Sequence, residues 1–260
     1  MEFDFIEVEI DNNVAKITLS NPDMLNTFTR KMALELHTSL RNIERNDEVR
    51  TVVLSGLGRA FSAGGNVHDL PTGKAAYIGK KYMDLMHRWF LLFYHLSKPT
   101  IAAVNGLAIG TGFNVVLAAD IVLASEKSFF GQAFAKVGLI SDLGGLYLLP
   151  RLVGLNKAKE LILTGATISA SEAHELGIVN RVVAHDKLSQ ETEAIAHKIA
   201  SGPRHVARLS KAVMHKGLSM DIDSFLELEA YAQSLCLEGK EHIEGAGAFL
   251  NKREPDFLSL

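Results

Sequence analysis

The side chain whose surroundings point most directly to chemistry is Asp142, in the segment "GLISDLGG" at residues 138–145. Its neighbours Leu139, Ile140 and Leu143 are apolar, and the next basic residue toward the C-terminus is Arg151. Apolar surroundings raise the pKa of a carboxyl group and make its ionised form a stronger base. Aspartate also favours the N-cap of a helix, and "LGGLYLL" has helical character. The segment therefore supports two interpretations, a catalytic base and a helix cap, which can coexist.

Two glycine-rich loops could supply hydrogen-bond donors. They are "SAGGN" at residues 62–66 and "GTG" at residues 110–112, and each follows an apolar run. Glycine lets backbone N–H groups approach a ligand closely, and a helix N-terminus adds partial positive charge. The loops are either ordinary tight turns or a pair of N–H donors that converge on one oxygen as an oxyanion hole. They match neither the dinucleotide-binding nor the P-loop pattern.

The elements that must position these residues alternate between strands and helices. "FIEVEI" and "VAKITLS" alternate apolar and polar residues around "DNN", which predicts a β-hairpin. The apolar runs "TVVLSG", "TIAAVNG" and "DIVLAS" predict strands buried on both faces of a parallel sheet. We expect helices between them, one capped by Thr27 or Thr29, one from about Ala76 to Leu96, and one ending at Ala119. This order predicts parallel βα units.

The second half of the chain is expected to be mainly helical. From Lys157 onward the pattern predicts helices interrupted by one short strand, "IVNRVV", and residues 201–260 contain no strand candidate. There is no internal repeat, low-complexity tract or linker. The sequence therefore predicts one α/β domain with a helical C-terminal extension.

Composition excludes several classes of function. The chain has 260 residues, of which 47% are hydrophobic, and a formal net charge of −3, so no global basic field attracts nucleic acid or an anionic membrane. The N-terminus lacks the basic start and apolar core of a signal peptide, and no apolar run reaches the roughly 20 residues of a membrane helix. The single cysteine, Cys236, is expected to be a small buried hydrophobe. These features predict a cytoplasmic protein.

Five segments in register resemble the enoyl-CoA hydratase/isomerase (crotonase) family over essentially the whole chain. They are "GRAFSAGGN", "PTIAAVNGLAIGTGFNVVLAADI", "FFGQAFAKVGLI", "LTGATISASEAHELGIVNRVV" and "EGAGAFLNKREPDF". The resemblance implies a spiral of ββα units, acyl-CoA thioester substrates, and a homotrimer or a dimer of trimers. It implies that the N–H groups of Gly65 and Thr111 form the oxyanion hole. It also implies a core at residues 1–200, with residues 201–260 for oligomerisation and cover of the active site.

The resemblance further implies which reaction to expect. In the hydratases of the family two glutamates activate water, and their positions match Asn114 and Phe134, neither of which can act as a base. An isomerase needs one acid, which moves a proton between C2 and C4 of a 3-enoyl thioester. Asp142 matches a position that some members use in this way, and the chain resembles in detail the branch that isomerises ring epoxides of phenylacetyl-CoA. We therefore expect an isomerase with Asp142 as its base, and weak or absent hydratase activity.

Other positions are assigned through the resemblance alone. Leu25, Ser62 and Ala63 match segments along the coenzyme path. Phe249 matches a terminal helix that can cover the acyl pocket. Lys252 and Arg253 match basic residues that can bind CoA phosphates, either in the same chain or in the site of a neighbouring subunit. Phe134 would form an apolar wall of the pocket, and no cofactor is expected beyond the CoA of the substrate.

Three alternatives remain open. In the 4-chlorobenzoyl-CoA dehalogenase branch an aspartate matching Asp142 is a nucleophile and a histidine matching His87 activates water, although the tryptophan of that branch corresponds to Phe134. A true hydratase and a non-catalytic member that binds acyl-CoA are the others. His68, His87 and His95 do not have spacing that indicates a metal site.

Overall fold

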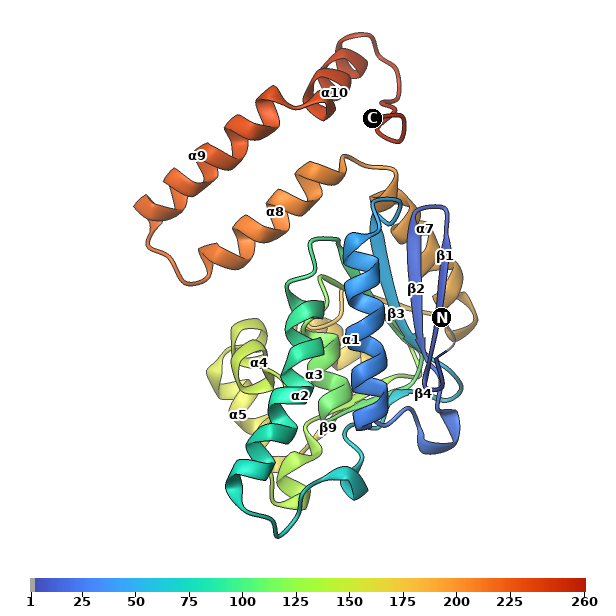
Figure 1. Cartoon of the computed structure of the whole chain (residues 1–260), viewed down its shortest axis with the longest axis vertical. Helices are drawn as coiled ribbons and strands as arrows, with labels where there is room; N and C mark the ends of the chain where they lie inside the picture. The colour runs from blue at the N-terminus through green and yellow to red at the C-terminus, as the bar shows by residue number, and fades with distance from the viewer. Residues whose placement is uncertain (1–2) are drawn as a thin grey trace.

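The computed structural model describes residues 3–260 and folds as a spiral in which successive ββα units each add strands to two sheets (Figure 1). The first pair of strands is the expected hairpin, β1 (Ile6–Asp11) and β2 (Val14–Leu19), paired antiparallel. Asn12 and Asn13 form its turn with φ values of 46° and 65°. Asparagine tolerates this left-handed conformation better than most residues, which explains the tight connection.

The larger sheet has six strands in the order β1-β2-β3-β5-β7-β10. Its parallel part contains β3 (Thr51–Gly56), β5 (Thr100–Val104), β7 (Ile121–Ser125) and β10 (Arg181–Val183). All five residues of β5 are buried, as its continuous apolar sequence predicts for a strand covered on both faces. The predicted parallel α/β architecture is confirmed.

The smaller sheet is a feature that the sequence did not predict. It consists of β4 (Ala60–Ser62), β6 (Leu107–Ile109), β8 (Phe129–Gly131) and β9 (Thr167–Ser169), in that order. Each strand has only three residues, too few to display a period of two. The expectation of one strand after Lys157 was therefore wrong, because β9 precedes β10.

The helices pack around these sheets. The N-cap of the first helix is Thr29, whose hydroxyl accepts the N–H of Met32, so the choice between Thr27 and Thr29 is decided. The long second helix ends at Tyr94, close to its predicted end. The α-helices are α1 (Arg30–Arg45), α2 (Ala76–Tyr94), α3 (Thr111–Leu117), α4 (Gly145–Val153), α5 (Leu155–Thr164), α6 (Ala170–Glu175), α7 (Leu188–Ala200), α8 (Arg204–Gly217), α9 (Ile222–Glu238) and α10 (Lys240–Leu250); the 3₁₀ helices are η1 (Pro22–Met24), η2 (Val67–Asp69), η3 (Ala133–Val137) and η4 (His185–Lys187).

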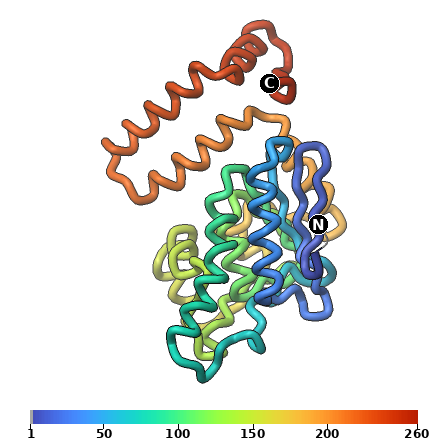
Figure 2. Tube along the Cα trace, viewed as in Figure 1, coloured from blue at the N-terminus to red at the C-terminus, as the bar shows by residue number. Residues whose placement is uncertain are grey.

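The C-terminal helices α8, α9 and α10 extend away from the sheets, and the trace of the chain shows α8 and α9 running side by side (Figures 1 and 2). One partly buried ion pair fixes α8 to the core: Lys211 Nζ lies 2.7 Å from Asp120 Oδ2. The same aspartate oxygen accepts the N–H and hydroxyl of Thr100 at the start of β5. α9 buries none of its residues in the single chain. Within residues 3–260 no helix combines the length and apolar character needed to cross a bilayer.

Candidate active site

Three segments that carry candidate residues begin at the C-terminal ends of neighbouring strands in the smaller sheet. β4 and β6 are parallel neighbours, and so are β6 and β8, so their C-terminal ends lie together. β4 leads into the "SAGGN" loop, β6 leads into Gly110 and the N-terminus of α3, and β8 leads into η3 and then Asp142. The short strands missed in the sequence are therefore the elements that bring the predicted site together.

The main chains of Gly65 and Thr111 are adjacent. A methyl group placed on Gly65 would lie 3.5 Å from Thr111 Oγ1, and one on Gly64 would lie 3.7 Å from the Thr111 nitrogen. Phe28 pairs with the chain on both sides of Gly65, donating to Gly64 O and accepting from Asn66 N, so the Gly65 N–H points to the opposite side. Within residues 3–260 neither the Gly65 nor the Thr111 N–H has a protein acceptor. The two loops thus present neighbouring free donors.

Glycine is required at two points of this arrangement. Gly64 has φ of 104°, and a methyl group there would lie 2.9 Å from Ile109 O, which is closer than side chains approach a backbone oxygen. Gly110 has φ of 55° and ψ of −120°, a combination that other residues rarely adopt. These glycines allow the two loops to approach one another, and an oxyanion hole formed by them remains a prediction.

Asp142 lies beside this pair of donors. Its Oδ1 accepts the hydroxyl of Thr111 at 3.2 Å, so the carboxylate faces the N-terminus of α3. Burial raises the pKa of Asp142 from 3.8 to about 6, although the hydrogen bonds from Thr111 and Asn114 act in the opposite direction. The predicted rise of this pKa is confirmed. A carboxylate with such a pKa is largely ionised at pH 7 and is a stronger base than an ordinary aspartate.

Two expectations about Asp142 were wrong. It does not cap α4, because the N-cap is Gly144 and no side-chain capping bond is present. Leu139 and Ile140 are exposed and cannot supply the apolar surroundings, whereas Leu143 is buried. The burial that raises the pKa therefore comes from tertiary packing, since two of the three apolar sequence neighbours point to solvent.

The predicted coenzyme-binding segments lie next to the "SAGGN" loop. Ala63 N donates to Leu25 O at 2.9 Å, and both residues are half-buried. Ser62 is completely buried; its hydroxyl donates to Asn26 O at 2.7 Å and accepts the N–H of Gly64. Ser62 thus fixes the shape of the loop. Contact of these residues with a coenzyme remains a prediction.

The C-terminal candidates are not brought to the site within one chain. Phe249 is 83% exposed on α10, and Lys252 follows that helix; Figure 1 shows α10 at the opposite end of the molecule from β4 and β9. Arg253 is occupied by an ion pair with Glu244, with two N–O distances of 2.6 and 2.8 Å. Any contact of Phe249 or Lys252 with this site would need another copy of the chain.

Several other candidates lie away from the site. His87 is exposed on the outer face of α2, whereas Tyr82, Met86 and Trp89 form the buried face. No cluster of three or more potential metal ligands of the His, Cys, Asp and Glu types occurs among residues 3–260. Cys236 on α9 is only half-buried, which corrects the expectation of a buried hydrophobe.

Aromatic residues around Asp142 were partly missed. A methyl group on Gly110 would lie 3.5 Å from the ring of Phe134, so this predicted wall residue packs beside the N-cap of α3. The ring of Phe90 packs against Gly144, two residues after Asp142. Tyr82 is buried, and its pKa is raised by that burial and then by the charges of Asp69 and Asp142. The helical stripe of aromatic residues on α2 was the sequence signal for this wall.

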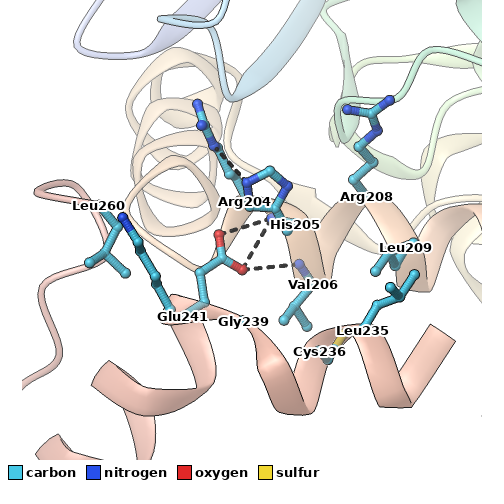
Figure 3. A pocket seen from close by; sticks show the side chains of 11 residues that line it. Arg204, His205, Val206, Arg208, Leu209, Leu235, Cys236, Gly239, Glu241 and Leu260 are labelled. Atoms are coloured by element: carbon cyan, nitrogen blue, oxygen red, sulfur yellow. Dashed lines mark hydrogen bonds between the residues drawn. The ribbon is translucent and has the colours of Figure 1, made fainter.

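A separate hollow of about 620 Å³ lies between α8, α9 and α10. Figure 3 shows the side chains that line it. The carboxylate of Glu241 accepts the N–H groups of His205 and Val206 there, at 3.0 to 3.2 Å, and so caps the N-terminus of α8. Its remaining lining includes basic and apolar side chains, namely Arg204, Arg208, Leu209, Leu235 and Cys236. None of the residues of the Asp142 site lines this hollow.

Comparison with known proteins gives matches over nearly the whole chain. A family profile described as enoyl-CoA hydratase/isomerase matches residues 9–259. The chain is 36% identical over 257 residues to the 1,2-epoxyphenylacetyl-CoA isomerase of Escherichia coli, covering 98% of each protein. It is 34% identical over 255 residues to the short-chain-enoyl-CoA hydratase of Clostridium acetobutylicum, covering 98% of this chain and 97% of that protein.

Solved structures agree with the spiral architecture. An enoyl-CoA hydratase subunit from Geobacillus kaustophilus superposes with a TM-score of 0.94 at 34% identity, covering 99% of each chain. The relatives in these comparisons include both an isomerase and hydratases at nearly equal identity. The choice between the two reactions therefore depends on the individual residues of the site.

Proposed function

The chain belongs to the enoyl-CoA hydratase/isomerase family, and from this premise we propose that it is an isomerase that moves a double bond in the acyl part of a CoA thioester. The observation that carries the proposal is Asp142, a carboxyl group whose pKa is raised to about 6 beside the free N–H groups of Gly65 and Thr111. The site joins one base with two donors, which is what such a proton shuttle needs.

In the proposed reaction the Asp142 carboxylate removes a proton from C2 of a 3-enoyl thioester, the carbon between the carbonyl group and the double bond. The electron pair shifts toward the thioester carbonyl, and the resulting dienolate oxygen accepts hydrogen bonds from the Gly65 and Thr111 N–H groups. The carboxylic acid then returns the same proton to C4, giving the 2-enoyl thioester. Each preorganised donor contributes on the order of 3 kcal/mol to such an intermediate. No proton, electron or water molecule is gained or lost overall.

The positions that match the two hydratase glutamates argue against hydration. Asn114 is completely buried, and Phe134 is an apolar residue beside Gly110. Neither can remove a proton from water. The names of the relatives include both isomerases and hydratases, so the argument against hydration rests on the side chains of Asn114 and Phe134.

Binding of the substrate is proposed to involve more than one chain. Leu25, Ser62 and Ala63 would follow the coenzyme, Phe134 would limit the acyl pocket, and Phe249 and Lys252 would come from a second copy in a homotrimer or a dimer of trimers. The exposed apolar residues of α9 and α10 support such an assembly, because they include Leu226, Tyr231, Leu235 and Ile243. The reaction as proposed needs no cofactor beyond the CoA of the substrate, and a cytoplasmic location remains a prediction.

A ring epoxide of phenylacetyl-CoA is a second candidate substrate, favoured by the 36% identity to an isomerase of that name. Dehalogenase-like chemistry is disfavoured because His87 is exposed on the outer face of α2 and does not point to Asp142. A non-catalytic member would bind acyl-CoA without turnover.

The decisive experiment compares 3-enoyl-CoA, 2-enoyl-CoA and ring-epoxide thioesters side by side. The isomerase proposal expects conjugated thioester to form from 3-enoyl-CoA, and expects Asp142→Asn to abolish this. Rapid loss of crotonyl-CoA absorbance that survives Asp142→Asn would instead establish a hydratase. Rates equal to the enzyme-free reaction across the panel would indicate a binding protein.

A further inference from the structure

Beneath Asp142, three buried polar side chains form a closed ring of hydrogen bonds. Asn114 Nδ2 donates to Ser141 Oγ at 3.0 Å, Ser141 Oγ donates to Gln132 Oε1 at 2.9 Å, and Gln132 Nε2 donates to Asn114 Oδ1 at 2.7 Å. The exposed fractions of Asn114, Gln132 and Ser141 are 0%, 1% and 4%. They come from α3, from the end of β8 and from the loop before α4, so the ring ties three separate segments together.

The chemistry of the groups fixes the direction of this ring. Asn114 Nδ2 also lies 2.8 Å from the main-chain oxygen of Asp142, which can only accept. The nitrogen of the amide must therefore face Asp142, and Asn114 Oδ1 must accept from Gln132. The Gln132 oxygen then has to accept from the Ser141 hydroxyl. Because every partner is satisfied in one orientation only, the ring is a rigid support rather than a set of exchangeable contacts.

The ring reaches Asp142 through α3. Thr111 and Asn114 are three residues apart and share one face of that helix. Thr111 donates to the carboxylate of Asp142, and Asn114 donates to its main-chain oxygen. One face of α3 thus holds both the side chain and the main chain of the proposed base.

The backbone after Asp142 needs such support. Leu143 has φ of 34°, in the left-handed region that is strained for a non-glycine residue. The main-chain oxygen of Asp142 accepts two bonds at this turn, one from Asn114 and one from Gly145 N, both at 2.8 Å. These bonds and the burial of Leu143 oppose the strain. Without these bonds and the packing of Leu143, the turn would relax and the side chain of Asp142 would point in another direction.

There is also no free space beside the ring. A methyl group on Gly145 would overlap both Ser141 Oγ and Asn114 Oδ1. Asn114 therefore occupies its position as a packed structural amide, with no access to solvent. A longer acidic side chain there would have to displace the ring.

We propose that Asn114, Gln132 and Ser141 are positioning residues that hold Asp142 in the direction its proton shuttle requires. The inference rests on the proposed function, since it assigns these residues to the same base. A base that serves two carbon atoms must be placed accurately for both, and a misplacement of about 1 Å costs on the order of 100-fold in rate. Asn114, which matches the position of a hydratase glutamate, would then serve the isomerase by holding the carboxylate of Asp142.

The test compares Ser141→Ala with Ser128→Ala. Both serines are buried and each hydroxyl donates to a protein oxygen, Gln132 Oε1 for Ser141 and Val104 O for Ser128, but only Ser141 belongs to the ring. We expect Ser141→Ala to lower kcat for 3-enoyl-CoA by about 10- to 100-fold with KM changed less than about threefold. The acidic limb of its pH–rate profile should move below about 6, because a relaxed carboxylate is better solvated. Ser128→Ala should keep kcat and the limb of the parent protein.

A second variant guards against misfolding. Gln132→Met keeps the length of the side chain but removes its hydrogen bonds, and the same split of kcat from KM is expected. If both ring variants keep the parent kcat and pH limb while Asp142→Asn is inactive, the positioning role is refuted and the proposed function stands. The positioning role is also refuted if Ser141→Ala and Ser128→Ala lose activity equally, in step with their loss of thermal stability, and the acidic limb of the pH–rate profile does not move. An active Asp142→Asn would overturn the proposed function itself.

Discussion

Replacing Asp142 by asparagine should make the protein less active and more stable at the same time. Asparagine has the same shape, and its side-chain oxygen can still accept the Thr111 hydroxyl that lies 3.2 Å from Asp142 Oδ1. It cannot accept a proton from carbon. Loss of a general base typically lowers kcat by 10²- to 10⁴-fold, which is the decrease that we expect for 3-enoyl-CoA.

The stability gain follows from the pKa of Asp142, which burial raises from 3.8 to about 6. The folded protein therefore binds this proton more tightly than the unfolded chain, and between these pH values its stability falls as pH rises. The cost of burying the charge is complete above about pH 6 and absent below about pH 4. A difference of about two pKa units corresponds to roughly 3 kcal/mol at most. Asp142→Asn should remove this cost and stabilise the fold at pH 7 by about 1–3 kcal/mol.

Two measurements on the same samples check this prediction. Formation of the conjugated thioester is followed by absorbance, and unfolding in urea is measured at pH 7 and pH 4. The stability advantage of Asp142→Asn should be clear at pH 7 and vanish at pH 4. A variant that is inactive but also less stable at pH 7 would refute the reasoning, because inactivity could then reflect a damaged fold. A variant with near-parental activity would refute Asp142 as the base.

Other substitutions test neighbouring parts of the structure. Thr111→Val removes a hydrogen bond that lowers the pKa of Asp142, so the acidic limb of the kcat/KM profile should move above about pH 6; a downward shift would contradict this. Lys211→Ala removes the ion-pair partner of the half-buried Asp120, which keeps its bonds from Thr100, and urea unfolding should show a loss of about 1–3 kcal/mol; an unchanged midpoint would contradict the anchoring of α8. Phe249→Glu should reduce the mass of the assembly in sedimentation experiments if the exposed α10 forms an interface between copies; an unchanged mass would exclude Phe249 from that interface.

The long elements were predictable because their patterns are local. The hairpin around Asn12, the buried strand from Thr100 and the long helix α2 all follow from patterns within a few residues. The three-residue strands of the smaller sheet could not be found in this way, since they are stabilised by pairing with strands tens of residues away. The same limit applies to the cap of α4, where Asp142 seemed a suitable candidate by sequence and Gly144 takes the position.

The principal residues of the candidate site were predictable from the sequence, but the residues that hold Asp142 in place were not. Asp142, Gly65 and Thr111 were identified from residue type and resemblance, and the structure brings them together. Gln132 and Ser141 gave no signal, because a glutamine and a serine acquire a role here only by meeting Asn114.

The sequence by itself determined which ionisable groups the site can contain. The resemblance predicts that Asn114 and Phe134 stand at the two positions of the hydratase glutamates, which leaves Asp142 as the candidate carboxyl group, and folding cannot change these residue types. Only the tertiary structure decided the properties of Asp142. Its apolar neighbours Leu139 and Ile140 turn to solvent, while Thr111 and Asn114, about 30 residues earlier in the chain, hold it in place. A pKa and a direction depend on the groups that surround a carboxylate in space, and sequence neighbours are only a small part of them.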